Sequence, residues 1–241
     1  MAPSNLNEVP MRRHTMATWI ITGANRGLGL EFAKQLLADG HSVIAGVRQP
    51  EMMEFDHERM TVLRLDVAST TSVHEFAENV KLATQSIDVL VNNAGRMDGR
   101  WQSLEEVDPE VSLEVLNVNT IGPLRVSQAL WPLLEGPNPT KIANISSLMG
   151  SIDDCMSGRS YAYRTSKTGL NMITKILAVE GKNKGISVTA YHPGWAKTDM
   201  GGERAPVPVS VSVQGLIGLI NEQDDVRTGR FFEYTGDELP W

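Results

Sequence analysis

Tyr163 and Lys167 are the residues of this sequence best placed to transfer a proton. They stand four positions apart in a stretch of helical periodicity near 161–180, so both side chains project from one helix face. A lysine charge beside a phenol favours the phenolate and is expected to lower the tyrosine pKa from about 10. Tyr163 could then donate and recover a proton near neutral pH. Helices also produce this spacing by chance, and Tyr161, with Thr165 four positions on, provides an internal control.

A glycine-rich turn with the sequence TGANRGLG occupies residues 22–29, between an apolar stretch of strand length and a helical pattern. Glycine permits a tight turn and a close approach of the backbone to a pyrophosphate. The free N–H groups at the start of the following helix attract an anion. Many strand-to-helix turns are rich in glycine without binding a ligand. Its position after the first strand, however, favours a site for nucleotide phosphates.

The residues after the second predicted strand bear on the choice of cofactor. A site for NAD usually has an acidic residue about 20 positions beyond the glycine loop, where it binds the ribose hydroxyls. Here that stretch reads Gly46-Val47-Arg48-Gln49 and contains no acid. The Arg48 guanidinium could pair with a 2′-phosphate, and Arg26 in the glycine loop adds a second positive charge. One surface arginine is usually only solvated, but two near one ribose favour NADP(H).

Two further turns, LDV at 65–67 and NNAG at 92–95, follow the third and fourth predicted strands. Ligands of open α/β sheets bind beyond the carboxyl ends of the strands, so these residues would line an adenosine groove. The same residue types also form ordinary turns, and for each turn taken alone that simpler interpretation is favoured.

Apolar runs of strand length alternate with longer helical patterns. This alternation predicts βαβ units and a parallel sheet with helices on both faces. We therefore predict an α/β fold, a single doubly wound parallel sheet (Rossmann fold) of about seven strands, in one domain over 16–241. The predicted strands are 19–22, 42–47, 61–65, 87–91, 141–145, 186–191 and 230–234. The predicted helices are 28–37, 73–82, 104–118, 121–135, 161–180 and 210–221.

Bulk composition argues against several other classes of protein. The net charge is −7 and no basic cluster occurs, so nothing suggests nucleic acid as a partner. No apolar run approaches the ~20 residues of a membrane span, and residues 1–15 lack the apolar core of a signal peptide. We interpret 1–15 as a flexible extension and expect a cytoplasmic protein, where its one cysteine, Cys155, stays an inert thiol. The five histidines lack metal-ligand spacing, so we expect no metal.

These segments jointly resemble the short-chain dehydrogenase/reductase family in its compact single-domain form. The family motifs appear in order from residue 17 onward as TGANRGLG, NNAG, NVNTIGP, ISS, YRTSK and HPGWAKTDM. The joint match is specific, although each motif alone is not. The segments GSIDD, YAYRTSK, PGWAKTDMGG and LPW further resemble the branch of C-factor and sniffer-type carbonyl reductases. The resemblance implies an NADP(H)-dependent oxidoreductase that moves a hydride between nicotinamide and a carbonyl or alcohol.

The resemblance also implies a role for each matching residue. Tyr163 would be the general acid/base, Lys167 would tune it and hold the nicotinamide ribose, and Ser147 would bind the substrate oxygen. Asn119 would anchor a water that links Lys167 to solvent. The other implied cofactor-binding residues are Gly23, Asn25, Arg26, Gly27, Leu28 and Gly29 at the phosphates, Asp66 and Val67 at adenine, Asn92, Ala94 and Gly95 at the adenosine ribose, and Pro193, Gly194 and Thr198 at the nicotinamide.

The choice of serine is the one point where the sequence departs from the family pattern. Sixteen residues separate Ser147 from Tyr163, slightly more than is usual in the family, and the loop between them carries Ser151 and Ser157. Ser146 also competes for the role. We favour Ser147 because the second serine of the ISS motif matches the family position.

Two other functions compete with a carbonyl/alcohol oxidoreductase. One is a nucleotide-binding signalling or regulatory protein of the C-factor type, but such a protein has no need of Tyr163. The other is a sugar-nucleotide epimerase, which the glycine spacing TGxxxGxG disfavours. The substrate is expected to be a small carbonyl or alcohol, bound in a partly apolar pocket. The predicted pocket residues are Arg96, Met97, Leu148, Met149, Trp195 and the segment 198–209.

The predicted helices at 104–118 and 121–135 carry more apolar residues than one sheet face requires. The apolar positions of the first are Leu104, Val107, Val111, Leu113, Val115, Leu116 and Val118. A helix that is apolar around much of its circumference is buried on more than one side. We therefore expect a homodimer or homotetramer that pairs these helices, as the resemblance also implies. The alternative is a monomer whose 150–160 loop or N-terminal extension covers them.

Overall fold

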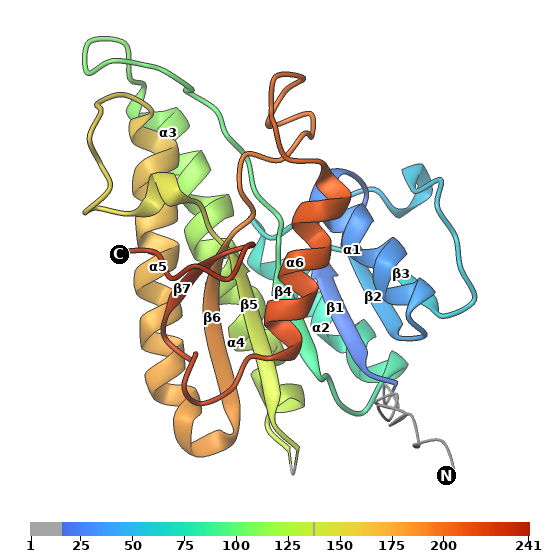
Figure 1. Ribbon diagram of the computed structural model, residues 1–241. Helices are drawn as coiled ribbons and strands as arrows, with labels where there is room; N and C mark the ends of the chain where they lie inside the picture. The colour runs from blue at the N-terminus through green and yellow to red at the C-terminus, as the bar shows by residue number, and fades with distance from the viewer. Residues whose placement is uncertain (1–15, 137) are drawn as a thin grey trace, which may run out of the picture.

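The computed structural model describes residues 16–136 and 138–241 (Figure 1). Within them, seven parallel strands form one sheet in the order β3-β2-β1-β4-β5-β6-β7. The strands are β1 (Thr18–Thr22), β2 (Ser42–Val47), β3 (Met60–Arg64), β4 (Val89–Asn92), β5 (Thr140–Ile145), β6 (Ile186–His192) and β7 (Phe231–Glu233). The predicted doubly wound sheet is confirmed. The strand order reverses between β1 and β4, and ligands of such sheets bind at this point.

Helices cover both faces of the sheet. They are α1 (Gly27–Ala38), α2 (Thr70–Ala83), α3 (Pro109–Leu116), α4 (Gly122–Leu134), α5 (Tyr161–Gly181) and α6 (Val209–Asn221). Helices α1 and α6 lie side by side on one face, and α2, α4 and α5 cover the other (Figure 1). Alternate strand residues enter the two cores, with Trp19 and Ile21 in the first and Ile20 in the second. The strands are therefore buried on both faces, as their continuous apolar runs predict.

Helix α3 begins later than the predicted helix over 104–118. The Asp108 carboxylate accepts a hydrogen bond from the Glu110 N–H at 2.9 Å, which caps the helix. Pro109 occupies the first turn, where its missing N–H costs nothing. Leu104 lies in the preceding turn and is 72% exposed, so its assignment to an apolar helix face was wrong.

A wide turn, the π-helix η2 (Asn117–Ile121), joins α3 to α4 without a break. The Gly122 N–H donates to the Asn117 carbonyl, five residues back. Pro123 has no N–H to give the Asn119 carbonyl, which is the bond that a regular α-helix would require there. The extra residue in this turn turns the Asn119 side chain into the interior, where it is fully buried.

The remaining predictions on the chain's organisation have different outcomes. No helix within the described ranges is long and apolar enough to cross a membrane. The predicted flexible extension, 1–15, lies outside the described residues. The single domain over 16–241 and the cytoplasmic location stay predictions.

Candidate active site

The glycine loop leaves the carboxyl end of β1 and turns directly into α1. Gly23 has φ +68°, in the left-handed region that favours glycine, and its N–H donates to the Gly46 carbonyl at 2.8 Å. A Cβ on Gly29 would lie 2.2 Å from the Gly23 carbonyl oxygen, so only glycine lets the helix approach its own loop so closely. No described side chain caps the N-terminus of α1, which leaves its N–H groups without a side-chain acceptor. This geometry fits a phosphate cradle.

The side chains of this loop and of the β2 end differ in what they contact. Arg48 directly follows β2 and is exposed, and no described side chain or carbonyl pairs with its guanidinium. Arg26 Nη1 donates to the Asp199 carboxylate at 2.8 Å, and this exposed ion pair links the glycine loop to the segment after β6. Asn25 is exposed, and Leu28 is half-buried against the α1 core. Arg48 is therefore the freer of the two arginines to meet a phosphate.

Asn93, to which the family resemblance gives no individual role, ties the turn after β4 to the glycine loop. Its Nδ2 donates to the carbonyls of Thr22 at 2.9 Å and Gly23 at 3.2 Å. The Thr22 hydroxyl accepts from the Ala94 N–H at 2.9 Å. Ala94 and Gly95 are thereby held beside the loop. An asparagine side chain can both donate and accept hydrogen bonds. An asparagine in the turn after β4 was therefore a signal that this turn could bind to a neighbouring one.

The side chain of Asn92 lies away from the predicted ribose site. It is 2% exposed, and its Nδ2 donates to Asn144 Oδ1 at 2.9 Å and Ser127 Oγ at 3.1 Å. Asn92 and Asn144 are register partners on β4 and β5. The side chain therefore joins the two strands to α4, and only the main chain of Asn92 is left to meet a ribose.

Asp66 and Val67 lie where predicted, beyond the carboxyl end of β3. The Asp66 carboxylate accepts from the Ala68 N–H at 3.0 Å and closes a short turn. Val67 is buried, and its carbonyl accepts from Arg125 Nη1 at 3.2 Å. A Cβ on Gly122 would lie 3.0 Å from Val67 Cγ2, so the start of α4 packs tightly against this turn.

Tyr163 and Ser147 meet at the carboxyl edge of the sheet, beyond β5. The Ser147 hydroxyl lies near enough to that of Tyr163 to lower its pKa, and each residue is 7% exposed. Ser146 instead donates to Asn171 Oδ1 at 2.6 Å, two turns further along α5. The Ser151 hydroxyl donates to the main-chain oxygen of Trp241 at 3.2 Å. Of the competing serines, Ser147 is therefore the one that the fold directs at Tyr163.

Lys167 is buried beside Tyr163. Its Nζ lies 5.8 Å from the centre of the Tyr163 ring and donates to the Ile145 carbonyl at 2.7 Å. A Cβ on Gly95 would lie 3.8 Å from this nitrogen, so the lysine also faces the turn after β4. Burial lowers the pKa of Lys167 to about 8, because a charged ammonium loses its hydration there.

The expected lowering of the Tyr163 pKa was wrong for this structure. Burial raises the pKa of Tyr163 to about 12, because a phenolate would be poorly solvated at this depth. The nearby Ser147 hydroxyl and the Arg100 charge lower the pKa, but by less than burial raises it. Tyr163 is therefore a neutral phenol at physiological pH, able to donate a proton.

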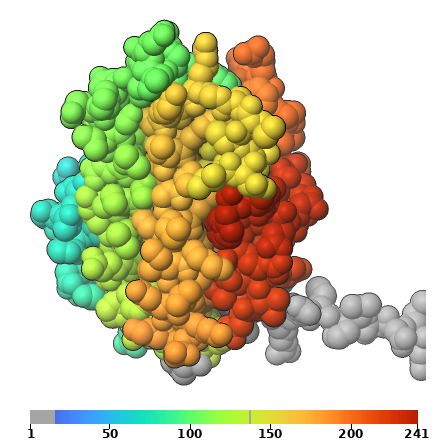
Figure 2. All heavy atoms as spheres, turned by 90° about the vertical axis from the view of Figure 1, so that its left-hand side faces the viewer, coloured from blue at the N-terminus to red at the C-terminus, as the bar shows by residue number. Residues whose placement is uncertain are grey.

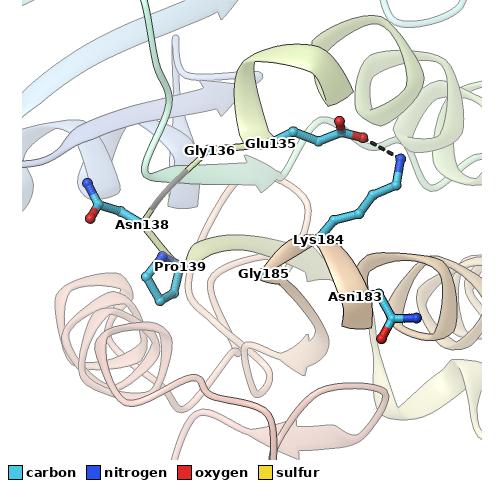
Figure 3. A pocket seen from close by; sticks show the side chains of 7 residues that line it. All are labelled: Glu135, Gly136, Asn138, Pro139, Asn183, Lys184 and Gly185. Atoms are coloured by element: carbon cyan, nitrogen blue, oxygen red, sulfur yellow. Dashed lines mark hydrogen bonds and ion pairs between the residues drawn. The ribbon is translucent and has the colours of Figure 1, made fainter.

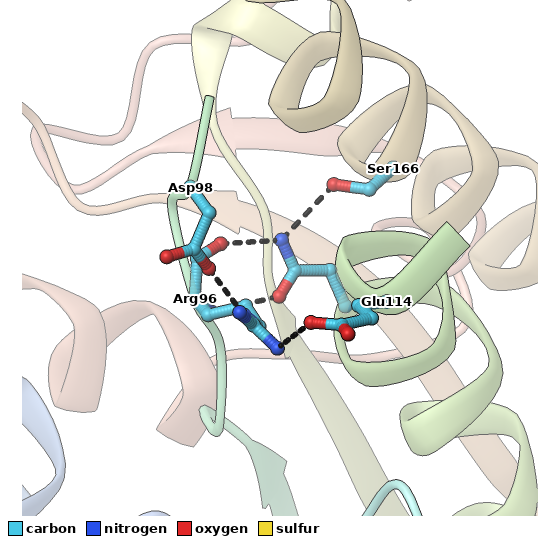
Figure 4. A network of polar contacts seen from close by, with 5 residues as sticks. Arg96, Asp98, Glu114 and Ser166 are labelled. Carbon is cyan, nitrogen blue, oxygen red and sulfur yellow. Dashed lines mark hydrogen bonds and ion pairs between the residues drawn. The ribbon is translucent and has the colours of Figure 1, made fainter. Parts of the chain in front are cut away.

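Asn119 takes part in a polar network with Arg96 and Ser166, whose residues Arg96, Asp98, Glu114 and Ser166 are labelled in Figure 4. Its Nδ2 donates to the Arg96 carbonyl at 2.9 Å and Ser166 Oγ at 3.0 Å, and its Oδ1 accepts from the Arg96 N–H at 2.9 Å. The Arg96 guanidinium pairs with Asp98 and, at 3.0 Å, with Glu114. The network fixes the loop after β4 to α3 and α5. Both N–H groups of the side-chain amide are thereby used, so a water anchored here would have to donate to the remaining acceptor capacity of Oδ1 or contact the main chain.

The turn after β6 brings Pro193, Gly194 and Thr198 to the same edge. The Pro193 carbonyl accepts from Ser212 Oγ at 2.6 Å, which fixes the turn to α6. A Cβ on Gly27 would lie 3.5 Å from Thr198 Cγ2, so Thr198 faces the glycine loop. The three residues therefore lie at the sheet edge that carries the glycine loop, and their contact with a nicotinamide stays a prediction.

The sequence also matches the model of a known protein family. The family model described as short chain dehydrogenase matches residues 17–207. The chain belongs to the short-chain dehydrogenase family. It is an oxidoreductase of that family, with the Rossmann-like sheet that the fold shows.

Individual relatives of this short-chain dehydrogenase include both a signal protein and carbonyl reductases. The C-signal of Myxococcus xanthus is 40% identical over 166 residues, which cover 69% of this chain and 98% of the relative. The carbonyl reductase Sniffer of D. melanogaster is 32% identical, with a TM-score of 0.89 over 94% of this chain and 100% of that one. The NADPH-bound carbonyl reductase from chicken fatty liver is also 32% identical, with a TM-score of 0.86 over 94% and 99%.

A pocket of about 370 Å³ opens in this short-chain dehydrogenase between the loops after β4 and β6. It is lined by Arg100, Trp101, Trp195, Gly201, Gly202, Glu203 and Arg204. Trp195 and part of the 198–209 segment thus line a pocket as predicted, whereas Arg96, Met97, Leu148 and Met149 do not line this one. Sequence reasoning missed Arg100 and Trp101, because no motif marks the loop that carries them.

A second, shallower hollow lies at the opposite edge of the sheet (Figure 3). Its lining precedes β5 and β6, at the amino ends of these strands, and includes Gly136, Asn183 and Gly185. The ion pair between Glu135 and Lys184 crosses it. The candidate catalytic residues lie at the carboxyl ends, so this hollow has no part in their chemistry.

Proposed function

We propose that this short-chain dehydrogenase is an NADP(H)-dependent carbonyl reductase in which Tyr163 is the general acid/base. The observation that carries the proposal is the convergence of three buried side chains at one sheet edge. The Tyr163 and Ser147 hydroxyls lie close together, and Lys167 lies beside the Tyr163 ring. The similarity to two carbonyl reductases, one of them bound to NADPH, supports both the reaction and the cofactor.

The residues at the sheet edge fit a dinucleotide along its length. Gly23 and Gly29 leave a cradle at the start of α1 that a Cβ would fill, and no described side chain caps that helix. Arg48 would hold the 2′-phosphate, and the turn with Asp66 would border the adenine. Near Lys167, the turn after β6 would hold the nicotinamide end.

The reaction needs groups that hold and protonate an oxygen. When bound, the nicotinamide supplies the hydride. The hydroxyls of Ser147 and Tyr163 would hydrogen-bond the substrate oxygen and stabilise the negative charge that develops on it. Tyr163 would donate its proton to that oxygen. The Lys167 ammonium would then stabilise the phenolate, whose charge is costly at this depth.

An Arg48→Asp variant is expected to raise the KM for NADPH by about 10²-fold, because a charge-assisted contact is replaced by repulsion of the 2′-phosphate. The KM for NADH should change much less, since NADH lacks that phosphate. Steady-state kinetics with both cofactors measure the effect, and Lys182→Asp, an exposed substitution at the opposite sheet edge, is the charge-matched control. A wild-type kcat/KM for NADH equal to or above that for NADPH contradicts the assignment.

The proposed activity is tested by NADPH oxidation with a panel of aldehydes, ketones and quinones. We expect oxidation that depends on the carbonyl compound and yields the corresponding alcohol. Oxidation that is no faster with any carbonyl compound than without one contradicts the proposal.

The similarity to C-signal favours a second candidate, a nucleotide-binding signalling protein with little turnover. Such a protein would bind NADP(H) in a calorimetric titration and consume none in the panel assay. The pairing of Tyr163 with Ser147 argues for catalysis, because nucleotide binding alone gives no use for this buried proton donor.

We also propose that the chain self-associates through the predicted helices, α3 and α4, together with the neighbouring α5. Met172, Ile176 and Val179 form one stripe on α5 and are 61%, 49% and 69% exposed. Leu113, Ile121 and Leu124 are exposed along α3, η2 and α4. In Figure 2 these helices lie side by side at the surface, and the yellow 150–160 loop covers only the upper end of α5. That loop therefore leaves most of the apolar surface open, which supports pairing with a second copy.

Light scattering of the purified protein at micromolar concentration is expected to give at least twice the single-chain mass of 26.4 kDa. An Ile176→Glu variant should lower the mass toward that of one chain, since it places a charge in the paired surface. The exposed position lets a single chain accept the glutamate without unfolding. A wild-type mass near 26.4 kDa means that the protein is a monomer and contradicts the prediction.

A further inference from the structure

Backbone strain is concentrated at one place next to the candidate active site. Trp101, Arg159 and Ser160 have φ of +67°, +76° and +56°, and they are the non-glycine residues with positive φ in the described parts of the chain. All three lie where the loop after β4 meets the segment before Tyr163. Such conformations are unfavourable for residues with a Cβ and persist only where the surroundings hold them. This clustering suggests that the position of these residues matters for function.

Hydrogen bonds between the two segments hold this strained geometry. The Trp101 N–H donates to Ser160 Oγ at 3.1 Å, and the Ser160 N–H donates to the Gln102 carbonyl at 3.2 Å. Arg159 Nη1 donates to the Trp101 carbonyl at 3.3 Å. The main chain of Trp101 is thereby fixed, while its indole remains 58% exposed. A large aromatic side chain held out at a pocket mouth is suited to bind a flat ligand.

Arg100 crosses the mouth of the same pocket. Its guanidinium lies 5.3 Å from the centre of the Trp101 ring, and its Nη1 donates to the Met200 carbonyl at 3.3 Å on the opposite loop. Trp195, on that loop, donates its indole N–H to the Gly201 carbonyl at 2.8 Å and is 47% exposed. The pocket thus has an aromatic residue on each side and a guanidinium with further N–H groups to donate.

The two arginines that line this pocket, Arg100 and Arg204, form no ion pair with a described carboxylate. Arg26, Arg96, Arg227 and Arg230 all form ion pairs with carboxylates. Across residues 16–136 and 138–241, no carboxylate lies within ion-pair distance of Arg100 or Arg204, although Glu203 also lines the pocket. The chain as a whole carries a net charge of −7, whereas two arginines and one glutamate line this pocket, so its local charge is positive and favours an anion.

The pocket also lies close to the proposed proton donor. A Cβ on Gly99 would lie 4.0 Å from the Ala162 Cβ, so the Arg100 loop packs against the residue before Tyr163. The charge of Arg100 is near enough to lower the pKa of Tyr163, against the larger effect of burial. Tyr163 does not itself line the pocket, so a ligand that meets Arg100 with one end has to extend past the lining residues to bring its carbonyl to the Tyr163 hydroxyl.

We propose that this pocket is the substrate site and that it selects aromatic carbonyl compounds carrying an anionic group such as a carboxylate. The indoles of Trp101 and Trp195 contact the ring, and Arg100 binds the anion. The inference rests on the proposed carbonyl reduction for the fate of the substrate, but the selectivity of binding is measurable on its own.

The test is a calorimetric titration of the protein with para-carboxybenzaldehyde and, separately, with its methyl ester. These probes share the ring and the carbonyl and differ in charge. We expect the carboxylate to bind about tenfold more tightly, with the preference weakening as salt is added. In Arg100→Met the preference should disappear, and in Trp101→Ala both probes should bind more weakly. Lys81→Met removes an exposed charge at the far end of α2 and should leave the preference intact.

Equal affinity for the two probes, a preference that survives in Arg100→Met, or binding of neither probe overturns the inference. Reduction of the same aldehydes by NADPH is measured in parallel and reports on the proposed function. Charge-selective binding without any reduction leaves the pocket assignment intact and rejects the carbonyl reductase. Reduction of both probes with equal kcat/KM and equal affinity supports the reductase and rejects the anion selectivity.

Discussion

Replacement of Tyr163 by phenylalanine is expected to lower kcat for carbonyl reduction by about 10²–10⁴-fold, which corresponds to about 3–5 kcal/mol of the barrier. The ring is 7% exposed and packed, and phenylalanine preserves that packing. Only the hydroxyl is lost, together with its interaction with the nearby Ser147 hydroxyl. The proton donor is thereby removed while the glycine loop is untouched, so the Kd for NADPH should stay within about twofold. Stopped-flow turnover and a cofactor titration measure the two quantities.

Tyr161→Phe is the matched control for that substitution. Tyr161 stands two residues earlier on α5, is 39% exposed, and has Thr165 rather than a lysine four positions on. Its loss of a hydroxyl should leave kcat nearly unchanged. Wild-type activity in Tyr163→Phe, or an equal loss in Tyr161→Phe, is incompatible with the proposed role of Tyr163.

Removal of the Lys167 charge is expected to damage both turnover and cofactor affinity, with kcat/KM for NADPH falling by about 10²-fold. Lys167→Met is preferable to Lys167→Ala, because a Cβ on Gly150 would lie only 2.7 Å from the Lys167 Cβ and the site is tightly packed. Methionine fills that space without a charge. The readouts are steady-state kinetics and a calorimetric Kd for NADPH, with thermal unfolding as a check on folding.

The pH dependence separates a charge effect of Lys167 from a packing effect. Burial lowers the pKa of Lys167 to about 8, so the ammonium is present below that pH and lost above it. Since kcat/KM for NADPH reports on groups of the free enzyme, it should fall as the pH rises through about 8. Tyr163, with a pKa of about 12, stays protonated over this range and contributes no such fall. An identical fall in Lys167→Met means that another group titrates there.

The sheet could be predicted because its strands are apolar on both faces and are bounded by turn residues. All seven strands agree with the predicted ranges to within two residues at each end. The start of α3 was missed although its signals were present. Asp108 and Pro109 form an N-terminal cap, but the apolar residues upstream, from Leu104, extended the predicted pattern through them.

The residues of the candidate site could be proposed from the sequence. Their burial and the direction of the Tyr163 pKa shift could not. Spacing places Tyr163 and Lys167 on one helix face, but the depth at which Tyr163 is buried depends on packing from distant segments. That depth reverses the direction of the pKa shift. The Asn92 side chain points inward because Asn92 pairs in register with Asn144 on the neighbouring strand. A single sequence does not reveal which strand residues are paired. Arg100 reaches the site only through the fold of an irregular loop.

Transfer of an isotopic label tests most directly whether this short-chain dehydrogenase moves a hydride to a carbonyl. The protein is incubated with NADPH deuterated at the transferable C4 position and an aromatic aldehyde that is active in the panel assay. We expect mass spectrometry to find one deuterium on the carbinol carbon of the alcohol, and little alcohol with the Tyr163→Phe variant. Alcohol without deuterium, or label transfer that is as fast in Tyr163→Phe as in the wild type, would contradict the proposed chemistry.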